Sequence, residues 1–142
     1  MHITFHVKDE CLIDTKDLPQ VLKYIGGIAH NLGSILIAAG GISNHIHLLV
    51  TLPKTISLAE YTAKIKANSS RWIKTIGSQY HAFSWQDGYG AFSVSASKIE
   101  AVRAYIANQV EHHRKKTYSE EVEEFFLSYD LAQVPPLRGS DE

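Results

Sequence analysis

Apolar and polar residues alternate in two stretches of the first half of the chain. Residues 2–7 place every second side chain on an apolar face, and residues 42–52 repeat this pattern. A period of two is typical of a strand with one face in a core. A short apolar run at residues 34–39, ended by the glycine pair at 40–41, and residues 91–95 predict two more strands. We expect the run at 34–39 and the strand at 42–52 to form a hairpin.

Apolar residues recur at helical spacing in other stretches. Helices are predicted over residues 17–33, 57–76 and 98–116, and an acidic helix over about 119–129. Serine followed three residues later by glutamate, the capping-box pattern, opens the second and third of these helices. The tail at residues 131–142 has the composition of a frayed end.

The predicted order is strand, helix, strand, strand, helix, strand, helix. This order indicates an α+β fold of the ferredoxin-like (RRM-like) type, an antiparallel sheet with helices packed on it. With 142 residues and 44% apolar content, we expect one domain over residues 1–142, with 1–130 as core and 131–142 as C-terminal tail. The fold serves many functions, so function has to be argued from particular residues.

Two pairs of residues could carry chemistry. His45 and His47 point to the same face of their strand, and two neutral imidazoles side by side suit a divalent metal. Tyr105 and Gln109 lie one helical turn apart, so both side chains can reach one point. The alternatives are a hydrogen-bonded structural histidine pair, a boundary tyrosine and a solvated glutamine.

These motifs, in this order, resemble the single-tyrosine HUH transposases of bacterial insertion sequences. That group is the insertion-sequence-200-like family, whose relatives include the REP-associated tyrosine transposases. The similarity follows the chain through residues 2–8, 45–47, 66–71, 85–95 and 105–118, about nine tenths of its length. Each motif alone is unspecific, and their combination is specific.

The resemblance implies an HUH endonuclease acting in DNA transposition. His45, His47 and Gln109 would hold Mg²⁺ or Mn²⁺, and Tyr105 would attack single-stranded DNA to leave a 5′-phosphotyrosine and a free 3′-hydroxyl. The substrate would carry hairpins near element ends. Family members work as homodimers in which the tyrosine helix of one subunit can complete the metal site of the other. Many have an acidic residue where this chain has Asn44, which would weaken the orientation of His45.

Charge is divided along the chain although the net charge is −1. Residues 54–116 hold ten Lys or Arg against four Asp or Glu, and residues 117–142 hold one Arg against seven acids. A basic middle favours phosphate contact, and a solvated helix surface is the alternative. The candidates for DNA contact are Lys64, Lys66, Arg71, Lys74 and Arg114, with Trp85 as a surface for base stacking or, equally, a core residue.

Composition also limits the compartment and the rival functions. Cys11 is the only cysteine, and no apolar run has the length of a membrane span, so we expect a bacterial cytoplasmic protein without a membrane segment. The main alternative is a domesticated or non-catalytic ferredoxin-like protein that binds structured single-stranded nucleic acid. A metal-independent phosphoesterase with two catalytic histidines ranks last, because such enzymes need two separate His-x-Ser/Thr motifs.

Overall fold

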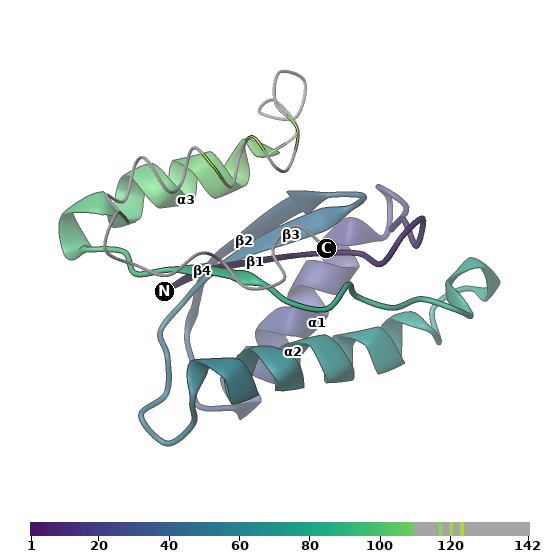
Figure 1. Cartoon of the computed structure of the whole chain (residues 1–142), viewed down its shortest axis with the longest axis horizontal. Helices are drawn as coiled ribbons and strands as arrows, with labels where there is room; N and C mark the ends of the chain where they lie inside the picture. Colours follow the sequence, from purple (N-terminus) through teal and green to yellow (C-terminus); the bar gives the residue numbers. More distant parts are fainter. Residues whose placement is uncertain (110–116, 118–119, 121–122, 124–142) are drawn as a thin grey trace.

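The protein folds around an antiparallel sheet with helices on both of its faces (Figure 1). The computed structural model describes residues 1–109 together with 117, 120 and 123. In chain order the elements are β1 (His2–His6), α1 (Leu18–Asn31), β2 (Leu36–Ile42), β3 (His45–Val50), α2 (Leu58–Ile73), β4 (Gly90–Phe92) and α3 (Ile99–Ala107), with 3₁₀ turns at Ser78–Tyr80 and Ala96–Lys98. The strand order is β2-β3-β1-β4. The predicted ferredoxin-like architecture is therefore confirmed.

The two faces of the sheet bury different kinds of side chain. One face is apolar and packs against α1 and α2, with Ile3, Phe5, Ile46 and Leu48 at its centre. The other face carries the histidines of β1 and β3 and is covered by α3, which lies on the opposite side of the sheet from α1 and α2 (Figure 1). The predicted alternation along the strands is what separates these faces.

α1 begins and ends close to its predicted limits, whereas α2 begins as predicted but ends at Ile73, before the predicted end at residue 76. α1 starts after Asp17 and is followed by Gly33, whose φ of 83° suits the end of a helix. At the start of α2 the Ser57 hydroxyl accepts a hydrogen bond from the Glu60 amide at 3.1 Å. The predicted capping box before α3 is absent. Ser97 lies within the 3₁₀ turn at Ala96–Lys98, and the N-cap residue of α3 is Lys98, whose side chain makes no capping hydrogen bond.

The glycine pair expected at the hairpin turn lies inside a strand. β2 continues through Gly40 and Gly41 to Ile42, which pairs with His45, and Ser43 and Asn44 make the turn. The glycines serve close packing instead, since a Cβ at Gly40 would overlap the carbonyl oxygen of Ile106 in α3. The backbone of α3 therefore lies directly on β2.

Several predictions concern residues beyond the described part. Outside the described residues lie the tyrosine helix from residue 110 to 116, including Arg114, the helix at 119–129 apart from residues 120 and 123, and the tail at 131–142. The division into a core and a tail stays a prediction. Within the part of the chain that is described, no helix has the length and apolar character needed to cross a membrane.

Candidate active site

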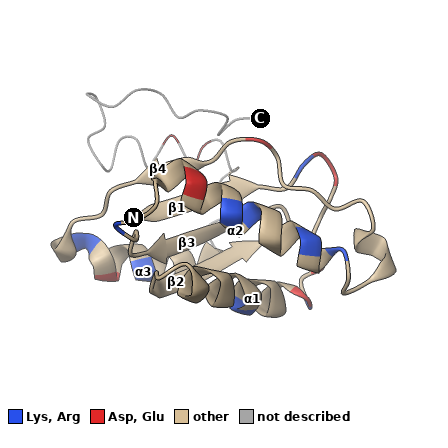
Figure 2. Ribbon diagram, turned by 90° about the horizontal axis from the view of Figure 1, so that it is seen from below, with Lys and Arg blue, Asp and Glu red and all other residues tan. Residues whose placement is uncertain are grey.

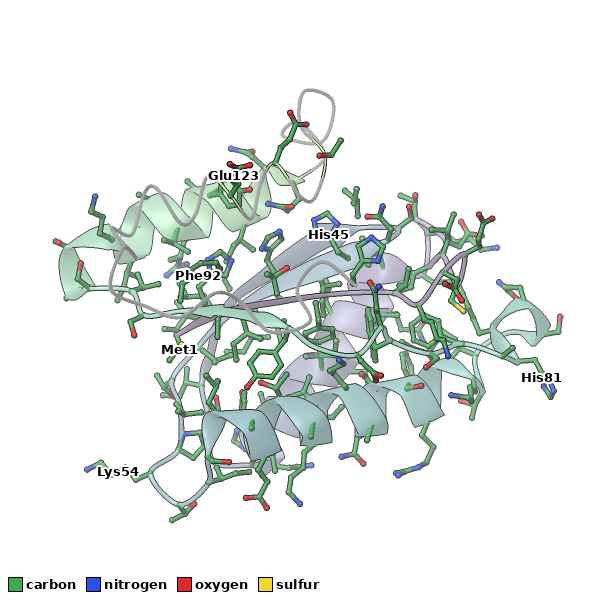
Figure 3. The ribbon with its side chains drawn as sticks, viewed as in Figure 1. Met1, His45, Lys54, His81, Phe92 and Glu123 are labelled. Carbon is green, nitrogen blue, oxygen red and sulfur yellow. The ribbon has the colours of Figure 1, made fainter. Side chains whose placement is uncertain are left out.

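The two histidines of β3 lie side by side beneath α3. His45 and His47 are both fully buried, and their ring centroids are 5.1 Å apart at an interplanar angle of 80°. His45 extends from β3 toward the side of the sheet that α3 occupies (Figure 3). Both rings share one face because they are two residues apart in a strand.

α3 brings the predicted tyrosine and glutamine onto this pair. The Tyr105 ring stands perpendicular to the His47 ring with centroids 5.8 Å apart, and Gln109 Oε1 lies 3.3 Å from His45 Nε2. Gln109 follows the helix cap at Asn108. Its side chain is directed back along the helix, because the side-chain nitrogen Nε2 donates to the backbone carbonyl of Tyr105 at 3.3 Å. The structure thus gathers all four residues that the sequence singled out.

His45 has an oxygen atom beside each of its ring nitrogens. Nδ1 lies 2.8 Å from Asn44 Oδ1, and Nε2 faces Gln109 Oε1. A neutral imidazole carries one hydrogen, so it can donate to only one of these acceptors. The shorter contact, to Asn44, takes that hydrogen, and the lone pairs of His45 Nε2 and Gln109 Oε1 then face each other. A cation between them would remove this conflict.

Two imidazole nitrogens and one amide oxygen are borderline ligands that suit a divalent cation without selecting which one. Neighbouring ligands of an octahedral Mg²⁺ ion, bound at about 2.1 Å, lie roughly 3 Å apart, near the observed 3.3 Å between His45 Nε2 and Gln109 Oε1. Among the described residues no group of three or more His, Cys, Asp or Glu could hold a metal. A cation held by two imidazoles and an amide would keep positions for water and phosphate oxygens.

The side chain of Asn44, at the position where the resemblance led us to expect an acid, contacts His45. It sits in the β2–β3 turn, where its backbone carbonyl accepts from the Val7 amide at 2.8 Å and the neighbouring Ser43 carbonyl accepts from the Ile13 amide at 2.8 Å. These bonds fix the turn from which the Asn44 side chain reaches His45. The expected loss of orientation at His45 is thus offset by a neutral acceptor at the same position.

Two histidines of β1 also lie on this face. His2 Nε2 is 3.0 Å from His47 Nδ1, and the His6 ring stacks on His45 with centroids 6.2 Å apart. His6 Nδ1 donates to the Val7 carbonyl at 2.6 Å. Sequence reasoning missed His2 as a neighbour of the site. The alternation in residues 2–7 indicates that His2 lies on the polar face of its strand. Only the register between β1 and β3 shows that this places His2 beside His47.

The basic residues predicted to contact DNA are remote from the histidines. Lys64, Arg71 and Lys74 are exposed along α2, on the opposite side of the sheet from α3 (Figures 1 and 2). These three residues could contact only a part of the DNA that lies away from the histidines. Arg114 lies outside the described residues, so its contact stays a prediction.

Two other DNA-contact candidates have structural roles. The Lys66 amine donates to the carbonyls of Gln86 and Gly88 at 2.6 and 2.9 Å, which ties the loop before β4 to α2. Trp85 is only 5% exposed, and its indole N–H donates to Ser69 Oγ at 2.9 Å. The core alternative for Trp85 is therefore the observed one, because a buried ring has no open face for a base. DNA contact by Lys66 stays a prediction.

Comparison with known proteins agrees with this arrangement. The family model described as "Transposase IS200 like" matches residues 1–109. A crystal structure of a protein described as a transposase from Deinococcus radiodurans R1 is similar with a TM-score of 0.57 and 20% identity, covering 76% of this chain and 88% of that one. A REP-associated tyrosine transposase bound to a REP hairpin is similar with a TM-score of 0.58 and 14% identity, covering 95% and 81%.

The two kinds of comparison carry different weight. At these identities the solved structures establish the shared fold. A search of curated proteins gave no match. The family model spans both halves of the candidate site, from the histidine strand to Gln109, and more than half of the chain. The chain therefore belongs to the family of IS200-like transposases.

Proposed function

We propose that this transposase cleaves single-stranded DNA and rejoins it through a 5′-phosphotyrosine at Tyr105, with Mg²⁺ or Mn²⁺ held by His45, His47 and Gln109. One observation carries the proposal. Separate segments of a transposase chain, a strand and a helix, converge so that a tyrosine lies against one histidine and a glutamine oxygen against the other. A half-buried tyrosine and three buried potential metal ligands thus meet on one face of the sheet.

Tyr105 supplies the nucleophile in this scheme. Its phenol oxygen attacks the scissile phosphorus, the bond from phosphorus to the 3′-oxygen breaks, and the phenol hydrogen ends on that oxygen. One phosphodiester replaces another, so the step is reversible and needs no ATP. The metal, when bound, would polarise the scissile phosphate. His45, His47 and Gln109 would hold it, and their side chains are buried beneath α3.

DNA with hairpins near element ends is the substrate we propose. Support comes from the similar REP-associated transposase, which was solved with a REP hairpin. We also propose that the protein acts as a homodimer in the bacterial cytoplasm. The exchange of the tyrosine helix between subunits stays a prediction, since within one chain α3 already lies on its own histidine strand.

Covalent capture of DNA tests the proposal. The full chain and its Tyr105→Phe variant are incubated with labelled hairpin-bearing single strands in Mn²⁺, and label is sought on denatured protein. We expect an adduct with the parent chain, none with the variant, and none when EDTA replaces Mn²⁺.

A second tyrosine provides the matched control. Tyr89 has no glutamine one turn later, so Tyr89→Phe should still form the adduct. An adduct that survives Tyr105→Phe would refute the assigned nucleophile. DNA binding that persists in EDTA, with no adduct under any condition, would instead favour the non-catalytic nucleic-acid-binding alternative.

A further inference from the structure

His2 is a buried polar residue whose side chain lies against His47. It is fully buried on β1, and its Nε2 lies 3.0 Å from Nδ1 of His47. Thr4, and not His2, stands directly opposite His47 in the antiparallel register, so the two rings meet diagonally across the strands. The ring centroids are 5.1 Å apart. Such a contact between two buried imidazoles requires that one ring donates and the other accepts.

The direction of this hydrogen bond decides what His47 can do. Nδ1 of His47 is engaged with His2, so Nε2 is the ring nitrogen that can coordinate a metal. Coordination needs a lone pair on Nε2, and in a neutral ring the hydrogen must then sit on Nδ1. Only the arrangement in which His47 Nδ1–H donates to His2 Nε2 satisfies both requirements.

We infer that His2 is a positioning residue that accepts the Nδ1 hydrogen of His47 and thereby holds this ring in its metal-binding tautomer. His45 has the same arrangement, with Asn44 as the acceptor. Each candidate histidine ligand would thus have its own fixed acceptor, one from the β2–β3 turn and one from β1. The inference rests on the proposed metal site for its purpose, but the tautomer itself is a property of the metal-free protein.

The tautomer is tested first, without metal or DNA. A long-range ¹H–¹⁵N correlation spectrum of the full chain shows which nitrogen of His47 carries hydrogen. We expect the Nδ1–H form in the parent chain and in His2→Gln, whose amide oxygen can accept in place of Nε2. We expect a mixture, or the Nε2–H form, in His2→Leu. An Nε2–H form of His47 in the parent chain would overturn the inference.

Metal affinity is tested next, by Mn²⁺ titration calorimetry on the same proteins. Loss of a partner that orients a ligand typically weakens metal binding about 10–100-fold, which is the change expected for His2→Leu. His2→Gln should recover most of the affinity, and His30→Gln, an exposed histidine of α1, should change nothing. Thermal unfolding of each variant separates loss of binding from loss of fold.

The outcomes separate this inference from the proposed function. If the parent chain binds Mn²⁺ through His45 and His47, and folded His2→Leu binds it equally well, only the role of His2 is wrong. The same holds if His2→Gln binds as weakly as His2→Leu, because shape and not the acceptor would then matter. If the parent chain binds no Mn²⁺, the proposed metal site is wrong, and so is the role of His2 in orienting a metal ligand.

Discussion

At the scale of single residues, the site depends on hydrogen bonds that assign one hydrogen to each imidazole. Asn44 Oδ1 lies 2.8 Å from His45 Nδ1, and the carboxamide of Gln109 is turned by its bond to the Tyr105 carbonyl so that its oxygen faces His45 Nε2. The result is a pair of acceptor atoms that face each other. When His45 is neutral, a bound cation would satisfy both of these atoms.

Asn44 provides a prediction at this scale. Asn44→Asp replaces a neutral acceptor by a charged one, which hydrogen-bonds an imidazole N–H more strongly, so Mn²⁺ affinity should rise several-fold. Asn44→Ala removes the acceptor, and affinity should fall about 10-fold. Titration calorimetry with Mn²⁺ measures both changes.

Ser43 is the control for the turn that carries Asn44. Its backbone carbonyl accepts from Ile13, and Ser43→Ala keeps that bond. This variant should bind Mn²⁺ like the parent chain. Equal affinities of Asn44→Ala and Ser43→Ala would show that the Asn44 side chain has no part in metal binding.

At the scale of elements, the approach of α3 to β2 sets the distance between nucleophile and ligands. The helix packs through Val102 and Ile106 against the sheet near Leu49, and its backbone touches the strand at Gly40. Any side chain at Gly40 has to push α3 away. Tyr105 and Gln109 would then move from His47 and His45, because they belong to this helix or directly follow it.

Gly40→Ala tests this dependence. The added methyl group meets backbone, which cannot turn aside, so we expect a loss of about 1–3 kcal/mol in the free energy of unfolding. The rate of adduct formation under single-turnover conditions should fall at least 10-fold. Chemical denaturation and the covalent DNA assay measure the two effects.

Gly27→Ala is the matched control within a helix. A Cβ at Gly27 would have no neighbour within 4 Å, and alanine is favoured over glycine in a helix by roughly 0.5–1 kcal/mol. This variant should be as stable as the parent chain or more so, with unchanged adduct formation. Similar behaviour of the two variants would exclude the close contact at Gly40 as the cause.

At the scale of the whole molecule, the sheet separates the candidate active site from the basic helix. The site lies between the sheet and α3, and the exposed cations of α2 lie beyond the opposite face (Figures 1 and 2). DNA that meets both has to pass around an edge of the sheet. Mutations on α2 should therefore change the affinity for single-stranded DNA without changing the rate of adduct formation.

A triple variant tests this separation. Replacing Lys64, Arg71 and Lys74 by glutamine should weaken binding of single-stranded DNA. The slope of log affinity against log salt should become less steep by about 2, at roughly 0.7 for each phosphate that is no longer neutralised. The rate of adduct formation at saturating DNA should stay within about twofold of the parent rate. Fluorescence anisotropy at several salt concentrations gives the slope.

Two results would contradict this separation. A fall in the saturated rate would place the α2 cations in the chemistry, against their position beyond the opposite face of the sheet. Unchanged affinity and an unchanged salt slope would show that the DNA does not reach α2 at all.

Local sequence patterns were enough to predict most elements and to single out the two residue pairs of the candidate site. Alternation and helical spacing located strands and helices, and the fixed spacing of His45 from His47, and of Tyr105 from Gln109, placed each pair on one face. These are local properties of strands and helices, which the chain carries wherever it packs. The resemblance to the transposase family followed from the same motifs in order.

How these elements meet could not be predicted from local patterns and follows from the tertiary fold. Strand register brought His2 to His47, and close packing of α3 explained why Gly40 is inside a strand and not in the turn. Burial made Trp85 a core residue, and the placement of α2 put its cations on the far face from the histidines. Strand register, burial and the face of the sheet on which a helix packs depend on contacts between residues far apart in sequence. Local periodicity carries no information about such contacts.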